Sequence, residues 1–210
     1  MKQYIESLNW RYATKKYDTE RKVSSEDIES LKEAVRLSVS SMGLQPYKVL
    51  IIENPEVREQ LKPAANNQAS ITEASHLFVF ATETNVGPEH VNAYISNISK
   101  TREIEKDTLK PFENMMNGYM NTLSEENKTV WAAKQAYIAL STLINTAPLL
   151  KIDATPMEGF NAQQFDEILG LDKLGLHTAV IATVGYRHEE DAFQHLKKVR
   201  KPNEELFITI

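Results

Sequence analysis

The fold class is decided by one stretch, SEENKTVWAAKQAYIALSTLINTAP (124–148), which predicts a long helix buried on most sides. Ser124 is a favourable N-cap, Glu125 and Glu126 complement the dipole at the helix start, and Pro148 is expected to stop the helix. Apolar residues cover most of the circumference, namely Trp131, Ala132, Ala136, Ala139, Leu140, Leu143 and Ala147. This pattern predicts a buried central helix.

Strand-like runs lie on both sides of this helix in the sequence. HLFVFAT (76–82) is a continuous apolar run without alternation, which is typical of a central strand covered on both faces. YKVLIIE (47–53), TAVIATVGY (178–186) and ELFITI (205–210) also read as strands. Because the strands are mixed with helices, the sequence predicts a sheet flanked by helices.

Shorter helices are predicted elsewhere. They cover residues 2–9, a segment from about Ser24 with Ile28, Leu31, Val35 and Val39 on one face, the run PEVREQL after Asn54, and 161–170 with Gly170 as its C′ residue. Residues 87–121 are polar and weakly helical, and we interpret them as a mobile helical excursion. The six apolar residues at the chain end are too apolar to stay in water. They either pair within the chain or extend onto a partner's sheet edge.

Composition restricts the function. The chain has 210 residues, 41% of them hydrophobic and 25% charged, which fits one globular domain spanning 1–210. Its net charge of −5 disfavours nucleic-acid partners, because their affinity comes mostly from neutralising phosphates. There are no cysteines, so disulfides, thiolate catalysis and Cys-ligated metals are excluded. Any redox chemistry must therefore come from a bound cofactor.

No membrane partner is expected, since no stretch approaches the roughly 20 apolar residues of a membrane span. No signal-peptide pattern opens the chain, so we expect a cytoplasmic protein. The motifs of a Rossmann fingerprint, a P-loop, a zinc protease and a serine-hydrolase elbow are all missing, and we expect no metal site. His76 opens a buried strand and is interpreted as a satisfied structural residue.

Two basic clusters could bind an anion. They are the segment from Arg11 to Lys16 and the run Leu196–Pro202. Guanidinium and ammonium groups suit a phosphate monoester, although a solvated basic face explains the same pattern.

Three further loops could bind a ligand. Pro156-Met157-Glu158-Gly159-Phe160 has a glycine that allows close approach to its backbone, or it is simply a turn. Ser40–Pro46 could bind an anion or cap the preceding helix. Asn66-Asn67-Gln68 could recognise a heterocycle through its amides, or it is a polar loop.

The order of these motifs is specific, and together they resemble the flavin nitroreductase family. The resemblance rests on Arg-x-Ala-x-Lys at 11–15, Ser-Ser…Gln-Pro-Tyr at 40–47, an asparagine before Glu-Ala-Ser-His, Trp-x-Ala-x-Gln at 131–135, Pro-x-Glu-Gly-Phe at 156–160, and the closing Lys-x-Arg. It spans Arg11 to Ile210, is weakest in 83–123, and is strongest toward the oxygen-insensitive nitroreductase and dihydropteridine-reductase-like branch.

This resemblance implies an α+β nitroreductase-like fold, with a mixed, mainly antiparallel sheet wrapped by helices. It also implies an intertwined homodimer that binds FMN at its interface and exchanges C-terminal strands. The implied activity is hydride transfer from NADH or NADPH through FMN to a flat acceptor such as a nitroaromatic or quinone. A dihydropteridine or flavin reductase, and a non-catalytic flavin-binding sensor, remain alternatives.

The resemblance also implies the cofactor-binding residues. They are Arg11, Ala13, Lys15, Val39, Ser40, Ser41, Asn67, Ser70, Pro156, Met157, Glu158, Gly159, Lys198 and Arg200. Arg11, Lys198 and Arg200 would hold the phosphate, Lys15 and Asn67 would meet the pyrimidine ring, and the backbone of the 156–159 loop would reach N5. The segment 39–41 would come from the other subunit. No side-chain general acid or base is implied.

Four positions depart from the family pattern. Ala13 replaces a serine, Ser70 a lysine, Gly43 an asparagine and Val39 a proline. Since the phosphate-binding residues are intact, we expect FMN binding to survive these changes. Residues Phe112, Met115, Met116 and Tyr119 would line the acceptor pocket, or they pack in the core.

Overall fold

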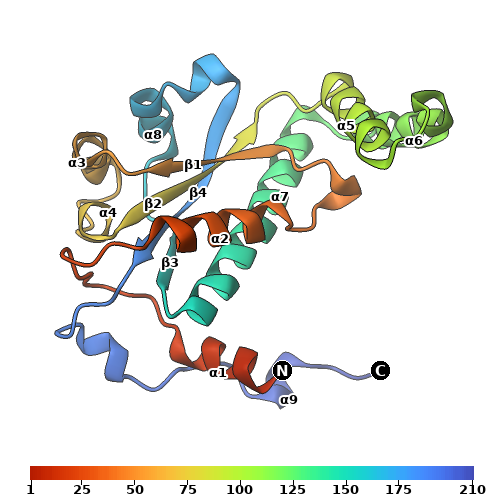
Figure 1. The fold of residues 1–210 in the computed structure, drawn as a ribbon. Helices are drawn as coiled ribbons and strands as arrows, with labels where there is room; N and C mark the ends of the chain where they lie inside the picture. The colour runs from red at the N-terminus through yellow and green to blue at the C-terminus, as the bar shows by residue number, and fades with distance from the viewer.

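The computed structural model describes all residues, 1–210. Its centre is a four-stranded sheet of β1 (Tyr47–Ile52), β2 (His76–Glu83), β3 (Asp153–Met157) and β4 (Leu176–Gly185), in the order β1-β2-β4-β3 (Figure 1). All three strand pairs are antiparallel. The α+β class and the mainly antiparallel sheet are thereby confirmed.

Helices surround the sheet (Figure 1). The α-helices are α1 (Lys2–Trp10), α2 (Ser25–Arg36), α3 (Pro55–Ala64), α4 (Ser70–Glu73), α5 (Pro88–Arg102), α6 (Lys110–Asn121), α7 (Glu125–Thr146), α8 (Ala162–Leu169) and α9 (Asn203–Leu206). Short 3-10 turns are η1 (Ser41–Gly43), η2 (Lys106–Leu109), η3 (Ala147–Leu150), η4 (Leu171–Leu174) and η5 (Ala192–His195). None of the helices is long and apolar enough to cross a membrane.

The central helix predicted from 124–148 is α7, and its start is as expected. The Ser124 hydroxyl accepts a hydrogen bond from the Asn127 backbone N–H. The α-helix ends at Thr146, just before Pro148 as expected, and the chain then continues through the 3-10 turn η3 to Leu150. Pro148 is tolerated there since the first turn of a helix does not need its missing N–H group.

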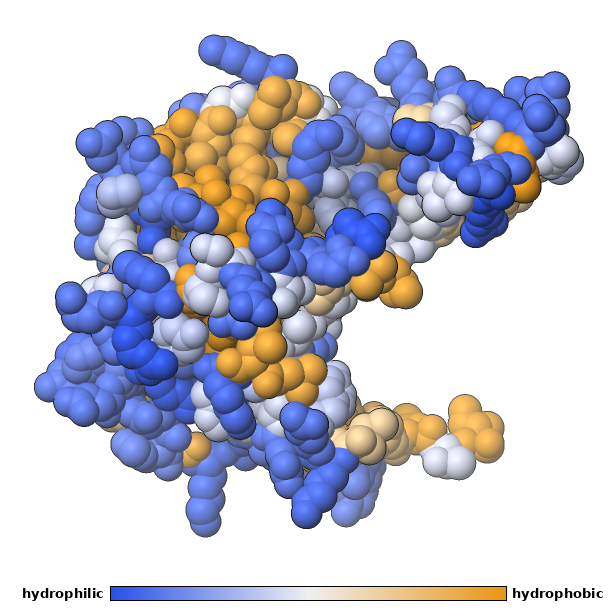
Figure 2. Space-filling model, in the orientation of Figure 1, coloured by the Kyte–Doolittle hydropathy of each residue, from blue (hydrophilic) through white to orange (hydrophobic).

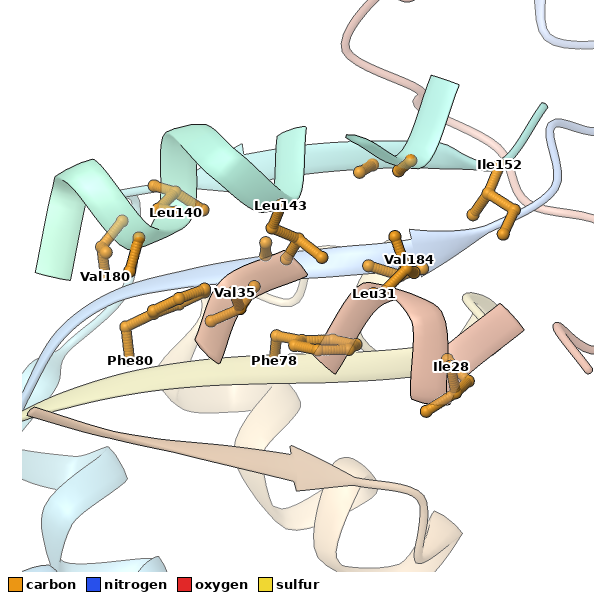
Figure 3. Close-up of a cluster of buried hydrophobic side chains, with 14 of the residues drawn as sticks. Ile28, Leu31, Val35, Phe78, Phe80, Leu140, Leu143, Ile152, Val180 and Val184 are labelled. Carbon is orange, nitrogen blue, oxygen red and sulfur yellow. The ribbon is translucent and has the colours of Figure 1, made fainter. Parts of the chain in front are cut away.

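One face of the sheet carries the largest core cluster, covered by α2 and α7 (Figure 3). Phe78 and Phe80 of β2 and Val180 and Val184 of β4 point toward these helices. The opposite face packs against α3 and α8 through a second cluster: Leu61, Ala64, Ala65, Ile71, Leu77, Val79, Met157, Phe165 and Ile181. The strand β2 is therefore covered on both faces, as its unbroken apolar run predicted.

The predicted apolar face of α2 is correct except at its end. Ile28, Leu31 and Val35 are buried, whereas Val39 is 75% exposed and lies beyond the helix. The helix stops at Arg36, so the helical periodicity no longer places Val39 on the buried face.

The structure differs from two other expectations. Residues 156–160 were interpreted as a loop or turn, but Pro156 and Met157 belong to edge strand β3 (Asp153–Met157), which pairs with β4. Residues 205–210 were expected to form a strand, but the segment holds the end of α9 and then Phe207–Ile210 without regular structure. A strand needs a hydrogen-bonding neighbour, and the four strands of this chain do not pair with that segment, so pairing within the chain is wrong. Pairing with a partner's sheet edge stays a prediction.

The helices α5 and α6 project from the sheet on one side of the molecule (Figure 1). Met116 and Met120 of α6 are fully buried there against Trp131 of α7 and Ile95 of α5. The structure also gives a reason for glycine at position 43. Gly43 has φ of +74°, and an added Cβ would lie 2.1 Å from the Tyr94 hydroxyl of α5.

Candidate functional site

Two adjoining depressions of about 290 and 370 Å³ are both lined by Ala13 and Lys15. The first is lined by Asn9, Trp10, Arg11, Tyr12, Ala13, Lys15, Phe193, Gln194, Leu196, Lys197, Lys198 and Arg200. The second is lined by Ala13, Thr14, Lys15, Gln68, Ala69, Ser70, Thr155, Pro156, Met157, Glu158 and Gly159. Small-molecule sites usually measure about 300–1,000 Å³, and these depressions lie at or just below the lower end of that range. A ligand as large as a nucleotide cofactor would therefore extend through both.

Positive charge converges in the first depression. The Lys198 ammonium donates to the Arg11 carbonyl, and Arg200 is close enough to act on both groups. Burial, followed by repulsion from Arg200, lowers the pKa of Arg11. Partial burial, followed by repulsion from Arg11 and Arg200, lowers the pKa of Lys198. The three cations thus destabilise one another unless an anion lies among them.

The Arg11 side chain also has an unsatisfied donor. One terminal nitrogen donates to the Tyr12 carbonyl at 3.2 Å and, weakly, to the Ala154 carbonyl at 3.5 Å. Its Nε atom is buried and has no hydrogen-bond partner. Buried donors are rarely left unpaired in proteins, so this atom indicates an acceptor supplied from outside the chain.

An ion pair fixes the segment that carries Arg11. Arg187, just after β4, binds both oxygens of Asp153 on β3, with an Nη2–Oδ1 distance of 2.6 Å. The Arg187 guanidinium also lies 3.9 Å from the ring centre of Trp10 and 4.5 Å from that of Tyr12. The pair therefore holds the end of α1 against the sheet.

Asp191 orders the other wall of the first depression. One of its oxygens accepts from the Lys15 and Lys16 backbone N–H groups and from the Tyr12 hydroxyl. Burial opposes the ionisation of Asp191, but these donors and the Phe193 N–H hold its pKa below the ordinary value. Asp191 thus ties the segment containing Ala13 and Lys15 to the turn η5.

The second depression ends at the 158–159 turn after β3. The Gly159 carbonyl accepts from the Asn66 and Gln68 side-chain amides at 2.8 and 2.9 Å. The Glu158 carboxylate accepts from the Tyr137 hydroxyl of α7 at 2.6 Å. The turn is therefore held by two different parts of the fold.

Comparison with known proteins identifies the family. A family model described as "Nitroreductase family" matches residues 8–186. A protein of Staphylococcus haemolyticus named "Putative NAD(P)H nitroreductase" is 36% identical over 213 residues, which covers 96% of this chain and 94% of the relative. The chain belongs to the nitroreductase family. This membership supports the predicted class of protein, an oxidoreductase.

Solved structures share the fold of this chain. Two of these structures are each described as a "putative nitroreductase". The structure from Bacillus subtilis has a TM-score of 0.90 at 20% identity and covers 100% of both chains. The structure from Exiguobacterium sibiricum, in complex with FMN, has a TM-score of 0.85 at 18% identity and covers 99% of this chain and 97% of its own.

The fold brings most of the predicted site residues together. Those that line the two depressions are Arg11, Ala13, Lys15, Ser70, Pro156, Met157, Glu158, Gly159, Lys198 and Arg200. Asn67 does not line either depression, although it adjoins Gln68, which does. Val39, Ser40 and Ser41 also lie elsewhere, after α2, where the Ser41 N–H donates to Gln135 of α7 at 2.7 Å.

Sequence reasoning missed the residues that support this site. These residues stand next to apolar strands or in loops, and their spacing forms no motif: Asp153, Arg187 and Asp191.

The predicted acceptor-pocket residues fall into two groups. Met116 is buried in the helical cluster, which favours the core-packing interpretation, whereas Met115 and Tyr119 are exposed.

Proposed function

We propose that this nitroreductase is an FMN-dependent NAD(P)H oxidoreductase that reduces flat acceptors such as nitroaromatics and quinones. The observation that carries the proposal is the buried, unpartnered Arg11 Nε among the mutually repelling charges of Lys198 and Arg200. A phosphate monoester supplies the acceptors and the negative charge that this arrangement lacks. The FMN complex of the related Exiguobacterium sibiricum protein supports this choice of cofactor.

The second depression suits the rest of the cofactor. Lys15 would stand beside the pyrimidine edge, where its charge stabilises the negative charge that develops on reduction. Ser70 and Met157 would lie against the ring system, with the Ser70 hydroxyl directed at the Met157 sulfur at 3.7 Å. The bound flavin would supply the two-electron chemistry, whereas the chain supplies binding, orientation and charge.

We further propose that the protein works as a homodimer. Large apolar side chains are exposed at Tyr4, Ile5, Val130, Tyr137, Ile138, Leu149, Leu150, Leu206, Phe207, Ile208 and Ile210. Figure 2 shows the apolar chain end projecting from the body of the molecule. Apolar surface of this kind usually marks an interaction site. A second subunit would cover the tail and would bring Ser40 and Ser41 to the cofactor.

The proposed function is tested by separating the two halves of the reaction. The FMN-loaded protein, kept anaerobic, should lose its flavin absorbance when NADH or NADPH delivers two electrons and a proton. Adding a nitroaromatic or a benzoquinone should then restore the absorbance, and steady-state plots should show ping-pong kinetics.

Two results would contradict parts of this proposal. Bound FMN that neither nucleotide reduces would indicate a flavin-binding sensor. Reduction of a quinonoid dihydropteridine or of free flavin much faster than of nitroaromatics, at a fixed NADPH concentration, would indicate the alternative reductase.

A further inference from the structure

The turn at residues 158–159 leaves two backbone donors free. The Phe160 N–H donates to the Glu158 carbonyl at 2.9 Å, and the Asn161 N–H donates to the Ala64 carbonyl at 2.7 Å. The N–H groups of Glu158 and Gly159, by contrast, donate to no atom of the chain. Both residues line the second depression, so these donors are available to a ligand there.

Two sets of side chains fix the orientation of this turn. On one side, Asn66 and Gln68 both donate to the Gly159 carbonyl. Asn66 has φ of +54°, a left-handed conformation that asparagine tolerates better than most residues. On the other side, Tyr137 of α7 donates to the Glu158 carboxylate. A turn held at both ends cannot rotate its peptide groups without breaking one of these contacts.

We propose that Tyr137 is a positioning residue for flavin reduction: by binding the Glu158 carboxylate from α7, it fixes the free Glu158 N–H in one orientation. This inference rests on the proposed function and on the backbone of the 156–159 loop reaching the flavin N5, as the family resemblance implies. A backbone donor contributes to a reaction only when it is already oriented before charge develops, because reorientation during the reaction costs free energy. Tyr137 would therefore act on the reaction and not on cofactor affinity.

The contact persists under the conditions of the reaction. Partial burial, followed by the hydrogen bond to Glu158, raises the pKa of Tyr137 to about 12. The hydroxyl therefore stays protonated at neutral pH and remains a donor. Cofactor affinity would depend mainly on Arg11, Lys198 and Arg200, which line the other depression. The two functions are thus separated in space and can be measured separately.

Replacing Tyr137→Phe removes only the hydroxyl group. The rate of FMN reduction by NADPH, measured by anaerobic stopped flow, should fall about tenfold, less than the roughly 10²–10³ lost when an oriented donor itself is removed. The flavin absorbance maximum should shift, because its hydrogen bonding changes, while the dissociation constant of FMN stays within about twofold.

Other variants separate positioning from a general structural effect. Glu158→Ala should slow FMN reduction as much as Tyr137→Phe does. The double variant should be no slower than either single variant, because both substitutions break the same contact. Glu158→Gln keeps a hydrogen-bond acceptor and should therefore slow FMN reduction less than Glu158→Ala does. Tyr47→Phe is the control, since it removes a hydroxyl that accepts from Gln45 at 3.3 Å. Releasing the other side of the turn with Asn66→Gly and Gln68→Ala should also slow reduction.

The outcomes distinguish this inference from the proposed function. If the unaltered protein does not bind FMN, or NAD(P)H does not reduce it, the proposed function is wrong and the inference falls with it. If the unaltered protein is reduced and Tyr137→Phe shows the same rate and spectrum, only the inference is wrong. A Tyr137→Phe variant that folds but loses FMN affinity would also overturn it, since the hydroxyl would then hold the cofactor.

Discussion

Replacing both Lys198 and Arg200 with alanine should lower the affinity for FMN by at least about 100-fold. A hydrogen bond to a charged group contributes about 1.5–3 kcal/mol, and 1.4 kcal/mol corresponds to a factor of ten. Removing two such donors therefore costs about 3 kcal/mol or more. The free protein should not be destabilised, because the charges of Arg11, Lys198 and Arg200 repel one another when no anion is present.

The affinity change is measured by titrating FMN against the protein and following the quenching of flavin fluorescence. Lys201→Ala is the matched control, since this neighbouring lysine is exposed and lines neither depression. It should leave the dissociation constant nearly unchanged at physiological salt. Equal affinities of the double variant and the unaltered protein would mean that the phosphate does not lie between these residues.

Replacing Asp153→Ala should lower the free energy of unfolding by about 3 kcal/mol, because breaking a buried ion pair leaves one charge uncompensated. The Asp153 side chain is only 2% exposed and Arg187 is 18% exposed, so water cannot replace the lost partner. The Arg187 backbone N–H and Nε would also lose their acceptor, and Nη2 would keep only the Trp10 carbonyl at 3.4 Å. Since Arg187 stacks on Trp10 and Tyr12, the segment with Arg11 should loosen too.

Urea unfolding followed by circular dichroism measures this change. Glu33→Ala provides the comparison, because its ion pair with Arg36 is exposed on the surface of α2 and its loss should make no measurable difference to stability. If Asp153→Ala and Glu33→Ala lowered the free energy of unfolding by similar amounts, burial would not explain the contribution of the Asp153–Arg187 pair to stability.

Elements whose residues show a clear periodicity could be predicted from the sequence. The helix α7 was found because apolar residues surround it, and β2 because its unbroken apolar run belongs to a strand covered on both faces. The strand β3 was missed because DATPM contains a proline and a charged residue. Its proline is tolerated because β3 lies at the edge of the sheet.

The site could be predicted only where its residues form a motif. The basic cluster and the Pro-x-Glu-Gly-Phe segment were recognised by their order along the chain. Asp153 and Arg187 were not, because they are 34 positions apart and meet only through the pairing of β3 with β4. Tyr137 was missed for the same reason, since its partner Glu158 lies in a turn after another element.

The chain terminus shows a further limit. An apolar tail such as ELFITI predicts burial, but its sequence does not say against which surface. Within one chain the tail stays exposed, with Ile208 at 87%. The local sequence therefore indicates that the tail needs a neighbour, and the identity of that neighbour is a property of the assembly.

The central claim is that these two depressions bind FMN, and the most direct measurement is the absorbance spectrum of the purified protein after incubation with FMN and removal of the unbound cofactor. We predict one FMN for each chain, with a flavin spectrum altered from that of free FMN. A colourless protein that retains no flavin after this treatment would contradict the account.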